Sequence, residues 1–456
     1  MARDQTDTTP LQSRDELVAW FEAGIKPKAE FRIGTEHEKT PFTVNGHRPV
    51  PYEGPRGIGA LLEGMRLLLG WEPIMEGGNI IGLHDVTGGG AISLEPGGQF
   101  ELSGAPLETV HQTQIELMAH LAQVREIAAP LGIRFLGLGL TPSWTRAEIP
   151  VMPKGRYKIM TGYMPKVGRY GLDMMYRTCT VQTNLDFSSE ADMVKKLRVA
   201  LALQPVATAL FANSPFTEGR PNGFLSFRSE IWRDTDNARA GMLPWAFETG
   251  MGFERWVDYA LDVPMYFVKR GEHYIDVSGT SFRDFFEGKN PKLPGEHPTL
   301  SDWANHLSTI FPEVRLKRYL EMRGADGVPW GRLPALPAFW AGLLYDDTSL
   351  DAAWDIAKTW TAHERQALRD DVPRLGFRAR IRNRYVFELA KECLVLAHAG
   401  LRRRARLDQL GRDETRHLNA LDEIVDSGRT PAEQMLDKYH GVWGGSVEPV
   451  YDEYAF

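Results

Sequence analysis

Strict alternation of polar and apolar side chains over residues 178–187 constrains the fold of this chain more than any other feature. The polar face consists of Thr178, Thr180, Gln182, Asn184 and Asp186, and the opposite face of Cys179, Val181, Thr183, Leu185 and Phe187. Successive side chains of a β-strand point to opposite faces, so this period of two predicts a strand. A polar face opposite an apolar one is typical of an antiparallel sheet whose second face lines water or a site.

Four other segments resemble strands and carry charged side chains at alternating positions. In 33–39, Glu36 and Glu38 share a face because strand side chains alternate. The other three segments and their polar residues are 92–102 with Glu95, Gln99 and Glu101, 224–232 with Arg228 and Glu230, and 318–323 with Glu321 and Arg323. In 92–102 the residues share a face only if the Pro-Gly-Gly at 96–98 does not shift the register. The pattern predicts that carboxylates and arginines converge.

Several carboxylates in one place indicate a cation. Burying like charges together is unfavourable unless a positive charge compensates them. Mg²⁺ commonly binds between one or two carboxylates and substrate phosphates. Phosphoryl transfer needs metal ions and arginines, because both oppose the negative charge on the transferring group. The alternative is a set of solvent-facing strand edges with incidental carboxylates, and alternation alone leaves both interpretations open.

A cluster of positive charge lies at residues 152–158. Lys154, Arg156 and Lys158 alternate there around Tyr157. Such a cluster can meet a polyphosphate or a carboxylate. We assign Lys154 and Lys158 to ATP and Arg156 to a substrate, and a solvated basic loop is the alternative.

Helical periodicity predicts helices at 13–24, 57–70, 107–129 and 193–211. Ser13 and Glu16 have the spacing of a capping box, and Pro205 is expected to kink or break the last of these helices. From about residue 335 to 456 the chain is expected to be mainly helical. No repeat or linker divides it, so the sequence predicts a single α+β domain over residues 1–456.

The composition excludes some classes of partner. The net charge is −7 and no long basic block occurs, which argues against nucleic acid. No apolar stretch reaches the length of a membrane span, and the first residues lack the apolar core of a signal peptide. The two cysteines, Cys179 and Cys393, form no disulfide framework. We therefore expect a cytoplasmic protein.

Eight long segments of unusual composition carry a resemblance to a known family. They are IGTEHEK (33–39), SLEPGGQFELSGAP (93–106), MPKGRY (152–157), RTCTVQTNLDFSSEADM (177–193), ALFANSPFTEGRPNGFLS (209–226), LDVPMYF (261–267), FPEVRLKRYLEMRGADG (311–327) and LPALPAFWAGLLYDD (333–347). In these segments the chain resembles glutamate–cysteine ligases of the plant and proteobacterial branch. The resemblance implies a glutamine synthetase-like fold, in which a curved antiparallel sheet forms a funnel surrounded by helices.

The resemblance also implies a metal site with two or three Mg²⁺ ions. The positions that match carboxylate ligands in the family are Glu36, Glu38, Glu101 and Glu321, and further ligands are expected at Glu95 and Gln182. Gln182 stands where a more distant bacterial branch has a histidine.

Other residues are matched to the substrates. Arg228 and Arg323 match arginines that hold glutamate and the transferring phosphate, so both are counted as catalytic. Trp232 is placed near the cysteine, and Gln99 is assigned to substrate binding.

The implied reaction joins the γ-carboxylate of L-glutamate to the amino group of L-cysteine, with ATP as a further substrate, in the first step of glutathione synthesis. The γ-carboxylate attacks the γ-phosphate of ATP, which gives γ-glutamyl phosphate and ADP. The cysteine amine then displaces phosphate. Neither step needs a covalent nucleophile on the enzyme, because position and charge suffice.

Only small molecules are expected as partners, without nucleic acid or membrane, and the chain is expected to be a monomer or a weak non-covalent homodimer. Plant members of the family carry two regulatory disulfides. The positions that match their cysteines here are Gln114, Val277, Lys292 and Pro334, so no such switch is expected.

Two alternatives stay open at this point. A ligase of the same architecture that joins glutamate to another amine would have the same activating residues. A catalytically silent homologue that binds glutamate or nucleotide as a regulator would not need the complete set of carboxylates and arginines.

Overall fold

The computed structural model describes residues 7–456, and its main element is a large antiparallel sheet. Its strands are β1 (Ile33–Thr43), β2 (Glu72–Glu76), β3 (Asn79–His84), β4 (Ala91–Leu94), β5 (Phe100–Ser103), β6 (Ile133–Leu136), β7 (Thr180–Leu185), β14 (Val314–Leu316) and β15 (Leu320–Asp326). Their order is β14-β15-β7-β1-β5-β4-β3-β2, and β6 pairs with the far end of β1. The predicted α+β class with an antiparallel sheet is confirmed.

Strand β7 has the two faces that the alternation predicts. Val181 and Leu185 are fully buried against the core, whereas Thr180 and Gln182 line a pocket on the other face. β7 pairs with β1 on one side and β15 on the other, so its polar face lies in the middle of the sheet. The polar residues of three neighbouring strands therefore face one space.

Helices surround this sheet. In the first part of the chain they are α1 (Arg14–Glu22), α2 (Ile58–Leu69), α3 (Val110–Leu131), α4 (Gly155–Tyr163), α5 (Gly171–Arg177), α6 (Glu190–Leu210), α7 (Phe227–Ile231), α8 (Phe253–Asp262), α9 (Phe282–Phe286) and α10 (Leu300–Leu307). The main core lies where α6 packs on β15 and the next helix, α11 (Ala335–Leu344), packs on β7.

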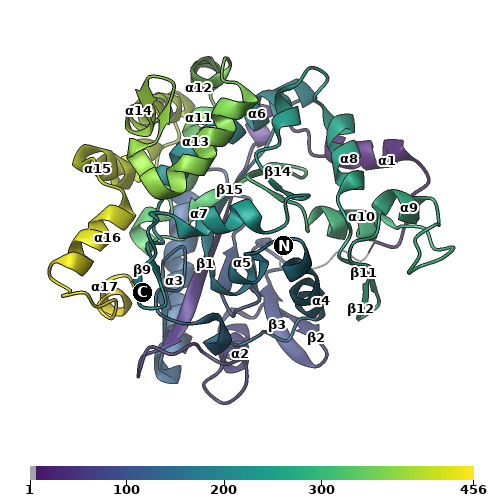
Figure 1. The fold of residues 1–456 in the computed structure, drawn as a ribbon, viewed down its shortest axis with the longest axis horizontal. Coiled ribbons are helices and arrows are strands. Elements are labelled where there is room, and N and C mark those ends of the chain that lie inside the picture. Colours follow the sequence, from purple (N-terminus) through teal and green to yellow (C-terminus); the bar gives the residue numbers. More distant parts are fainter. Residues whose placement is uncertain (1–6) are drawn as a thin grey trace.

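The last part of the chain is largely helical, as predicted. After α11 it contains α12 (Asp347–Ala357), α13 (Ala362–Leu375), α14 (Val386–Arg404), α15 (Asn419–Ser427), α16 (Pro431–His440) and α17 (Val450–Glu453). Figure 1 shows these helices, in green to yellow, along the upper and left sides of the molecule, away from β2 and β3. The short strand pairs are β8 (Phe216–Thr217) with β9 (Arg220–Pro221), β10 (Ala240–Gly241) with β13 (Phe311–Pro312), β11 (Phe267–Arg270) with β12 (His273–Asp276), and β16 (Arg380–Ile381) with β17 (Arg384–Tyr385).

Two details of the predicted helices differ in the structure, the capping box at Ser13 and the break at Pro205. Ser13 occupies the N-cap position of α1, but its side chain accepts no hydrogen bond from the helix. The carboxylate of Glu16 instead accepts a hydrogen bond from the backbone N–H of Gln12. Helix α6 runs through Pro205 without a break. Its residues from Val199 to Leu210 are buried all round, so tertiary packing outweighs the lost backbone hydrogen bond.

The segment 224–232 is a helix where alternation predicted a strand. Ser226 caps α7, because its side chain accepts from the N–H of Ser229 at 3.2 Å. A serine at this position favours a helical turn over an extended chain. Arg228 and Glu230 therefore do not share a strand face.

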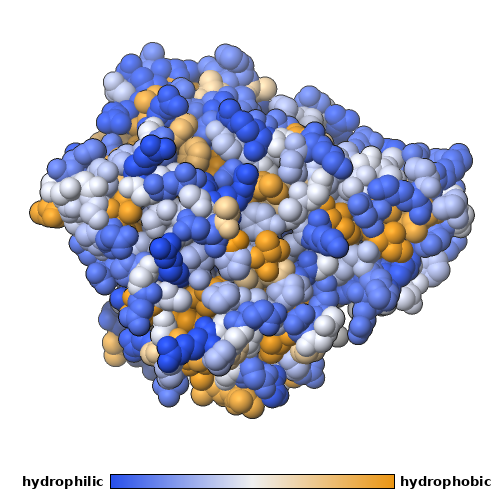
Figure 2. All heavy atoms as spheres, turned by 60° about the horizontal axis from the view of Figure 1, so that its bottom comes forward, coloured by the Kyte–Doolittle hydropathy of each residue, from blue (hydrophilic) through white to orange (hydrophobic). Residues whose placement is uncertain are grey.

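The surface carries no extended apolar band in the view of Figure 2, where hydrophobic residues lie in small groups among hydrophilic ones. Among residues 7–456, no helix combines the length and hydropathy of a membrane span.

Candidate active site

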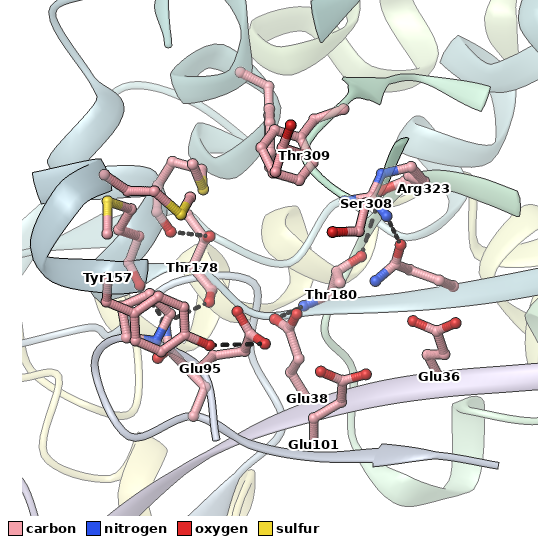
Figure 3. A pocket seen from close by; sticks show the side chains of 18 of the residues that line it. Glu36, Glu38, Glu95, Glu101, Tyr157, Thr178, Thr180, Ser308, Thr309 and Arg323 are labelled. Atoms are coloured by element: carbon pink, nitrogen blue, oxygen red, sulfur yellow. Dashed lines mark hydrogen bonds between the residues drawn. The ribbon is translucent and has the colours of Figure 1, made fainter. Parts of the chain in front are cut away.

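A pocket lies on the polar face of the sheet, and most of the predicted site residues line it (Figure 3). Strands β1, β5, β7 and β15 form its floor, and α4, α5 and α7 contribute to its walls. The predicted residues that line it are Glu36, Glu38, Glu95, Gln99, Glu101, Arg156, Gln182, Arg228, Trp232 and Arg323. The sheet thus brings together residues that are up to 287 positions apart in sequence, from Glu36 to Arg323.

Three carboxylates converge at one end of the pocket. Glu38 of β1 lies directly opposite Glu101 of β5 in the antiparallel register. Glu95 follows β4 in the tight turn to β5, and Figure 3 shows its carboxylate pointing toward the other two. Like charges directly opposite across a strand pair are destabilising. The fold thus holds a repulsive cluster in place.

The turn that carries Glu95 explains this convergence. The Pro-Gly-Gly at 96–98 reverses the chain between β4 and β5, so residues 92–102 form a hairpin where one strand was a possible prediction. Gly98 has a φ of +85°, and a Cβ on Gly97 would stand 2.3 Å from the carbonyl oxygen of Tyr176. Glycine is therefore required at both positions.

The protonation of these carboxylates reflects their crowding. Burial, and then the charges of Glu95 and Glu101, raise the pKa of Glu38 well above its usual value. Burial and Glu101 likewise raise the pKa of Glu95. Hydrogen bonds from Ser93 at 3.0 Å and Ser103 at 2.6 Å hold the Glu101 carboxylate. Nearby cations offset this only in part: Arg228 acts on Glu38, and Lys154 and Arg156 act on Glu95.

Arg323 enters the pocket from a bulge in β15. The register with β7 shifts between Met322 and Ala325, so Arg323 is released from the regular ladder. Its Nη1 donates to the side-chain oxygens of Gln182 and Glu321, each at 2.5 Å. The bulge therefore aims a guanidinium between two strands.

Glu321 lies beneath the pocket and is fully buried. Arg315 donates to it at 2.8 and 3.1 Å, Lys317 at 3.1 Å, and Arg323 also contacts it. Burial alone would raise its pKa, but these three cations outweigh burial and hold the pKa well below the usual value. The carboxylate is thus ionised and fully compensated, whereas the cations near Glu38 and Glu95 leave the pKa of each raised.

Arg228 lies on α7 and is buried at the wall of the pocket. Its Nη2 donates to the backbone carbonyl of Arg323 at 3.0 Å, and its Nε has no hydrogen-bond partner among residues 7–456. The Nε1 of Trp232, one turn later, also lacks a protein partner there. Two buried donors thus line the pocket ready for a ligand that accepts hydrogen bonds.

The comparisons with known proteins agree with this site. A sequence profile described as glutamate-cysteine ligase family 2 (GCS2) matches residues 32–453. This chain belongs to the glutamate–cysteine ligase family. The chloroplastic glutamate–cysteine ligase of Nicotiana tabacum is 59% identical over 444 residues, which cover 97% of this chain and 83% of that protein. The Arabidopsis thaliana enzyme is 59% identical over 98% of this chain and 84% of its own length. A rice enzyme, from Oryza sativa subsp. japonica, is 57% identical over 98% of this chain and 88% of its own.

Membership in the family establishes the reaction. The chain is an ATP-dependent ligase that joins glutamate to cysteine, in the first step of glutathione synthesis. A solved structure agrees in fold: the Francisella tularensis glutamate–cysteine ligase in complex with AMP superposes with a TM-score of 0.55 and covers 90% of this chain and 85% of that one at 14% identity.

The relatives contradict the predicted cytoplasmic location. Those from Nicotiana tabacum, Arabidopsis thaliana and rice are all named as chloroplastic enzymes. Location is set by targeting segments and not by the folded domain. The charge and the cysteine count of this ligase were therefore no basis for that prediction, which is wrong.

The basic residues of 152–158 have three different environments in this ligase. Arg156 lines the pocket beside Tyr157. Lys154 is buried and donates to the carbonyl oxygen of Leu94 at 3.2 Å, behind the hairpin turn. Lys158 is exposed on α4 and does not line the described pocket. The ATP assignments of the two lysines stay predictions.

Gln99 lines the pocket but is engaged with the backbone. Its Nε2 donates to the carbonyls of Met175 and Thr178 at 3.2 and 3.0 Å, and its Oε1 accepts from Gly97 at 2.9 Å. These bonds hold the hairpin turn against the end of α5, and the substrate assignment of Gln99 stays a prediction.

Sequence reasoning missed several lining residues. Arg315 could have been found from the sequence. It alternates with the buried Val314 and Leu316 on β14, and a lone arginine on an apolar strand needs a partner, which Glu321 provides. The others that were missed are Pro96, Tyr157, Met160, Met174, Met175, Thr178, Thr180, Phe267, Ser308, Thr309 and Phe311. Thr178 and Thr180 stood on the predicted polar face, whereas the apolar lining residues had no pattern that marked them.

The carboxylates of the pocket are suited to a divalent cation, although their oxygens are not already arranged around one ion position. No group of three or more His, Cys, Asp or Glu side chains within residues 7–456 is already arranged as the ligand set of one ion. Mg²⁺ does not require such a set, since it keeps several waters and takes one or two carboxylates plus phosphates. The crowded carboxylate oxygens of Glu38, Glu95 and Glu101 suit that ligand chemistry.

Proposed function

We propose that the ligase activates glutamate as γ-glutamyl phosphate inside this pocket, with Arg228 and Arg323 as the groups that meet substrate. The observation that carries the proposal is that carboxylates and buried arginines line the same pocket: the pKa of Glu38 stays raised by burial and by its neighbouring carboxylates although Arg228 opposes this, and the Nε of Arg228 has no hydrogen-bond partner among residues 7–456. A transferring phosphate carries negative charge that the arginines oppose. A carboxylate of glutamate would accept from the open Nε of Arg228.

Mg²⁺ would be held by Glu38, Glu95 and Glu101, with Glu36 and Gln182 as further ligands. When bound, it would supply positive charge between these carboxylates and the phosphates of ATP. Glu36 accepts from Asn184 at 2.8 Å, and Gln182 accepts from Arg323, so both have competing partners. Glu321 stays a predicted ligand, and a metal there would replace one of three cations that already bind it.

The chain's own residues position the two reacting groups. Arg228 would fix glutamate so that its γ-carboxylate faces the γ-phosphate, and Arg323 would oppose the charge on the transferred phosphate. Trp232 would border the incoming cysteine through its open Nε1. None of these residues forms a covalent bond with substrate. Removing water and fixing the reacting atoms lowers the barrier.

Isotope transfer tests the acyl phosphate. Glutamate labelled with heavy oxygen in its γ-carboxylate is converted with ATP and cysteine, and the released phosphate is analysed by mass spectrometry. If the carboxylate is phosphorylated, one labelled oxygen per turnover passes to phosphate. Labelled oxygen that leaves in water or in AMP, and not in phosphate, would exclude the acyl phosphate, while ADP release that depends on both amino acids would still define the ligase.

A further inference from the structure

Arg369 of α13 joins the two structural elements that carry the proposed substrate-binding arginines. It is buried, at 4% exposure, and does not line the active-site pocket itself. Its Nη2 donates to the backbone carbonyl of Ser229 at 2.8 Å, and its Nε donates to Oε1 of Glu313 at 2.8 Å. One guanidinium thus binds two separate segments.

The first segment is α7. Ser229 follows Arg228 directly, so its bond to Arg369 fixes the end of this five-residue helix. The start of α7 is held by Asp326, which accepts from Ser226 and Ser214 at 2.7 and 2.6 Å. A helix this short has little stability of its own, so these outside contacts set the direction in which Arg228 points.

The second segment is the β15 bulge. The backbone carbonyl of Glu313 accepts from the N–H of Arg323 at 3.1 Å. Its Oε2 lies 2.6 Å from where a Cβ on Gly324 would stand, so the side chain packs directly against the bulge. Arg369 holds that carboxylate, with Nη2 to Oε1 at 2.7 Å. The Arg369–Glu313 ion pair therefore supports the bulge through direct packing and a backbone hydrogen bond.

We infer that Arg369 is a positioning residue that sets the relative placement of Arg228 and Arg323, which are linked by one hydrogen bond of 3.0 Å. The inference rests on the proposed roles of these two arginines. A guanidinium presents several donors in a rigid planar fork, so it can hold a carbonyl and a carboxylate at once. Lysine has a single nitrogen on a flexible stem and cannot reproduce both contacts in the same geometry.

The test compares Arg369→Ala and Arg369→Lys with Arg233→Ala as the matched control. Arg233 and Arg369 both border a second cavity beside the pocket, and Arg233 also joins α7 to α13, through Glu230 and Asp370. Its ion pairs are partly exposed and therefore weak, and it has no contact with Glu313 or the β15 bulge. Because small misplacements of reacting groups are costly, we expect kcat/KM for glutamate to fall about tenfold to a hundredfold in Arg369→Ala, less in Arg369→Lys, and hardly at all in Arg233→Ala.

The split between KM and kcat separates positioning from simple loss of fold. A smaller folded fraction lowers the apparent kcat and leaves the glutamate KM unchanged. Misplacement of Arg228 raises that KM, and misplacement of Arg323 lowers kcat in the folded molecules. If Arg369→Ala keeps the wild-type KM, and its kcat falls only with the folded fraction, the inference is wrong.

Two measurements keep the test decisive if Arg369→Ala folds poorly. The double variant Arg369→Met with Glu313→Met removes both buried charges, so neither is left unpaired. We expect it to fold and still to show the raised KM and lowered kcat. The cavity beside Arg369 reaches the exposed Asn237 and Ala238, so guanidinium ion can enter it, and millimolar guanidinium should restore part of the activity of Arg369→Ala. A folded double variant with wild-type kinetics would overturn the inference.

Arg228→Lys and Arg323→Lys, assayed in parallel, distinguish a failure of the proposed function from a failure of the role proposed for Arg369. If both keep wild-type kinetics, the proposed roles of these arginines fail. If both lose activity while Arg369→Ala behaves as Arg233→Ala does, the proposed function stands and only the role of Arg369 is refuted.

Discussion

Replacing Glu38 with Gln should make the metal-free ligase more stable and the magnesium-loaded ligase less stable than the wild type. The substitution keeps the shape of the side chain, and the amide oxygen can still accept from the N–H of Thr180, now 2.9 Å from Glu38. It removes the charge that lies directly opposite Glu101. Relief of a cross-strand repulsion of this kind is worth up to about 1 kcal/mol.

Bound Mg²⁺ reverses the order. A ligand present at about a hundred times its Kd stabilises the wild type by about 2.7 kcal/mol. If loss of one carboxylate weakens binding tenfold, the variant forgoes about 1.4 kcal/mol of this at the same concentration. That loss exceeds the gain of about 1 kcal/mol in the metal-free state, so the sign of the difference changes.

The pH dependence has a defined sign. Because the folded-state pKa of Glu38 lies well above the usual value of 4.5, the carboxyl contributes stability that is complete below about pH 4.5 and is lost as the pH rises through the folded-state pKa. The advantage of Glu38→Gln in the metal-free protein should therefore be small at acidic pH and grow toward neutral pH. Mg²⁺ binding to the wild type should strengthen over the same range, since it must displace these protons.

Urea unfolding with either EDTA or Mg²⁺ measures these differences, with Glu72→Gln as the control. Glu72 is exposed on β2 of the same sheet and lies outside the pocket, so this variant should follow the wild type in both buffers. Equal stabilisation of the wild type and Glu38→Gln by Mg²⁺ would refute the metal assignment. A metal-free Glu38→Gln that is no more stable than the wild type would refute the repulsion argument.

Further substitutions address the other assignments. Arg228→Lys should raise the glutamate KM strongly and Arg323→Lys should mainly lower kcat, as measured by ADP release, because lysine lacks the planar fork. Lys158→Ala should raise the ATP KM only a few-fold, since an exposed ammonium is screened by salt, and an unchanged KM would exclude Lys158 from the ATP site. Activity should be equal with and without dithiothreitol. Burial raises the pKa of Cys393 to about 12 and also raises the pKa of Cys179, so neither thiol is reactive. Loss of activity on reduction would contradict this prediction.

The sequence predicted the sheet better than the elements that close the pocket. Alternation over 178–187 identifies β7, because a strand between a core and a polar pocket must have two different faces. It also places Glu36 and Glu38 correctly on β1. The same reasoning fails at Arg228, where period-two spacing over nine residues coincides with one helical turn capped by Ser226. Short segments do not distinguish the two periodicities.

The spacing of residues in the sequence could not predict which carboxylates have cations beside them. Glu38 and Glu321 look equivalent in sequence, as single carboxylates on strands near the site. In the structure Glu321 has three cations around it, from β14, β15 and the turn between them, whereas Glu38 has two further carboxylates. Which charges meet depends on strand order, and β14 and β15 reach β1 only through β7. This order is a property of the whole fold.

The bulge at Arg323 gives a physical reason for this unequal compensation. In a regular strand, Glu321 and Arg323 would face the pocket side by side, and their charges would cancel there. The register shift after Met322 instead lets Arg323 bridge Gln182 and Glu321, while Arg315 and Lys317 also bind Glu321 below the floor. Three cations thus share one carboxylate, so the group keeps a net positive charge, and Arg323 brings part of that charge to the pocket. Straightening the bulge would therefore weaken the opposition of charge that phosphoryl transfer requires, even with every charged residue retained.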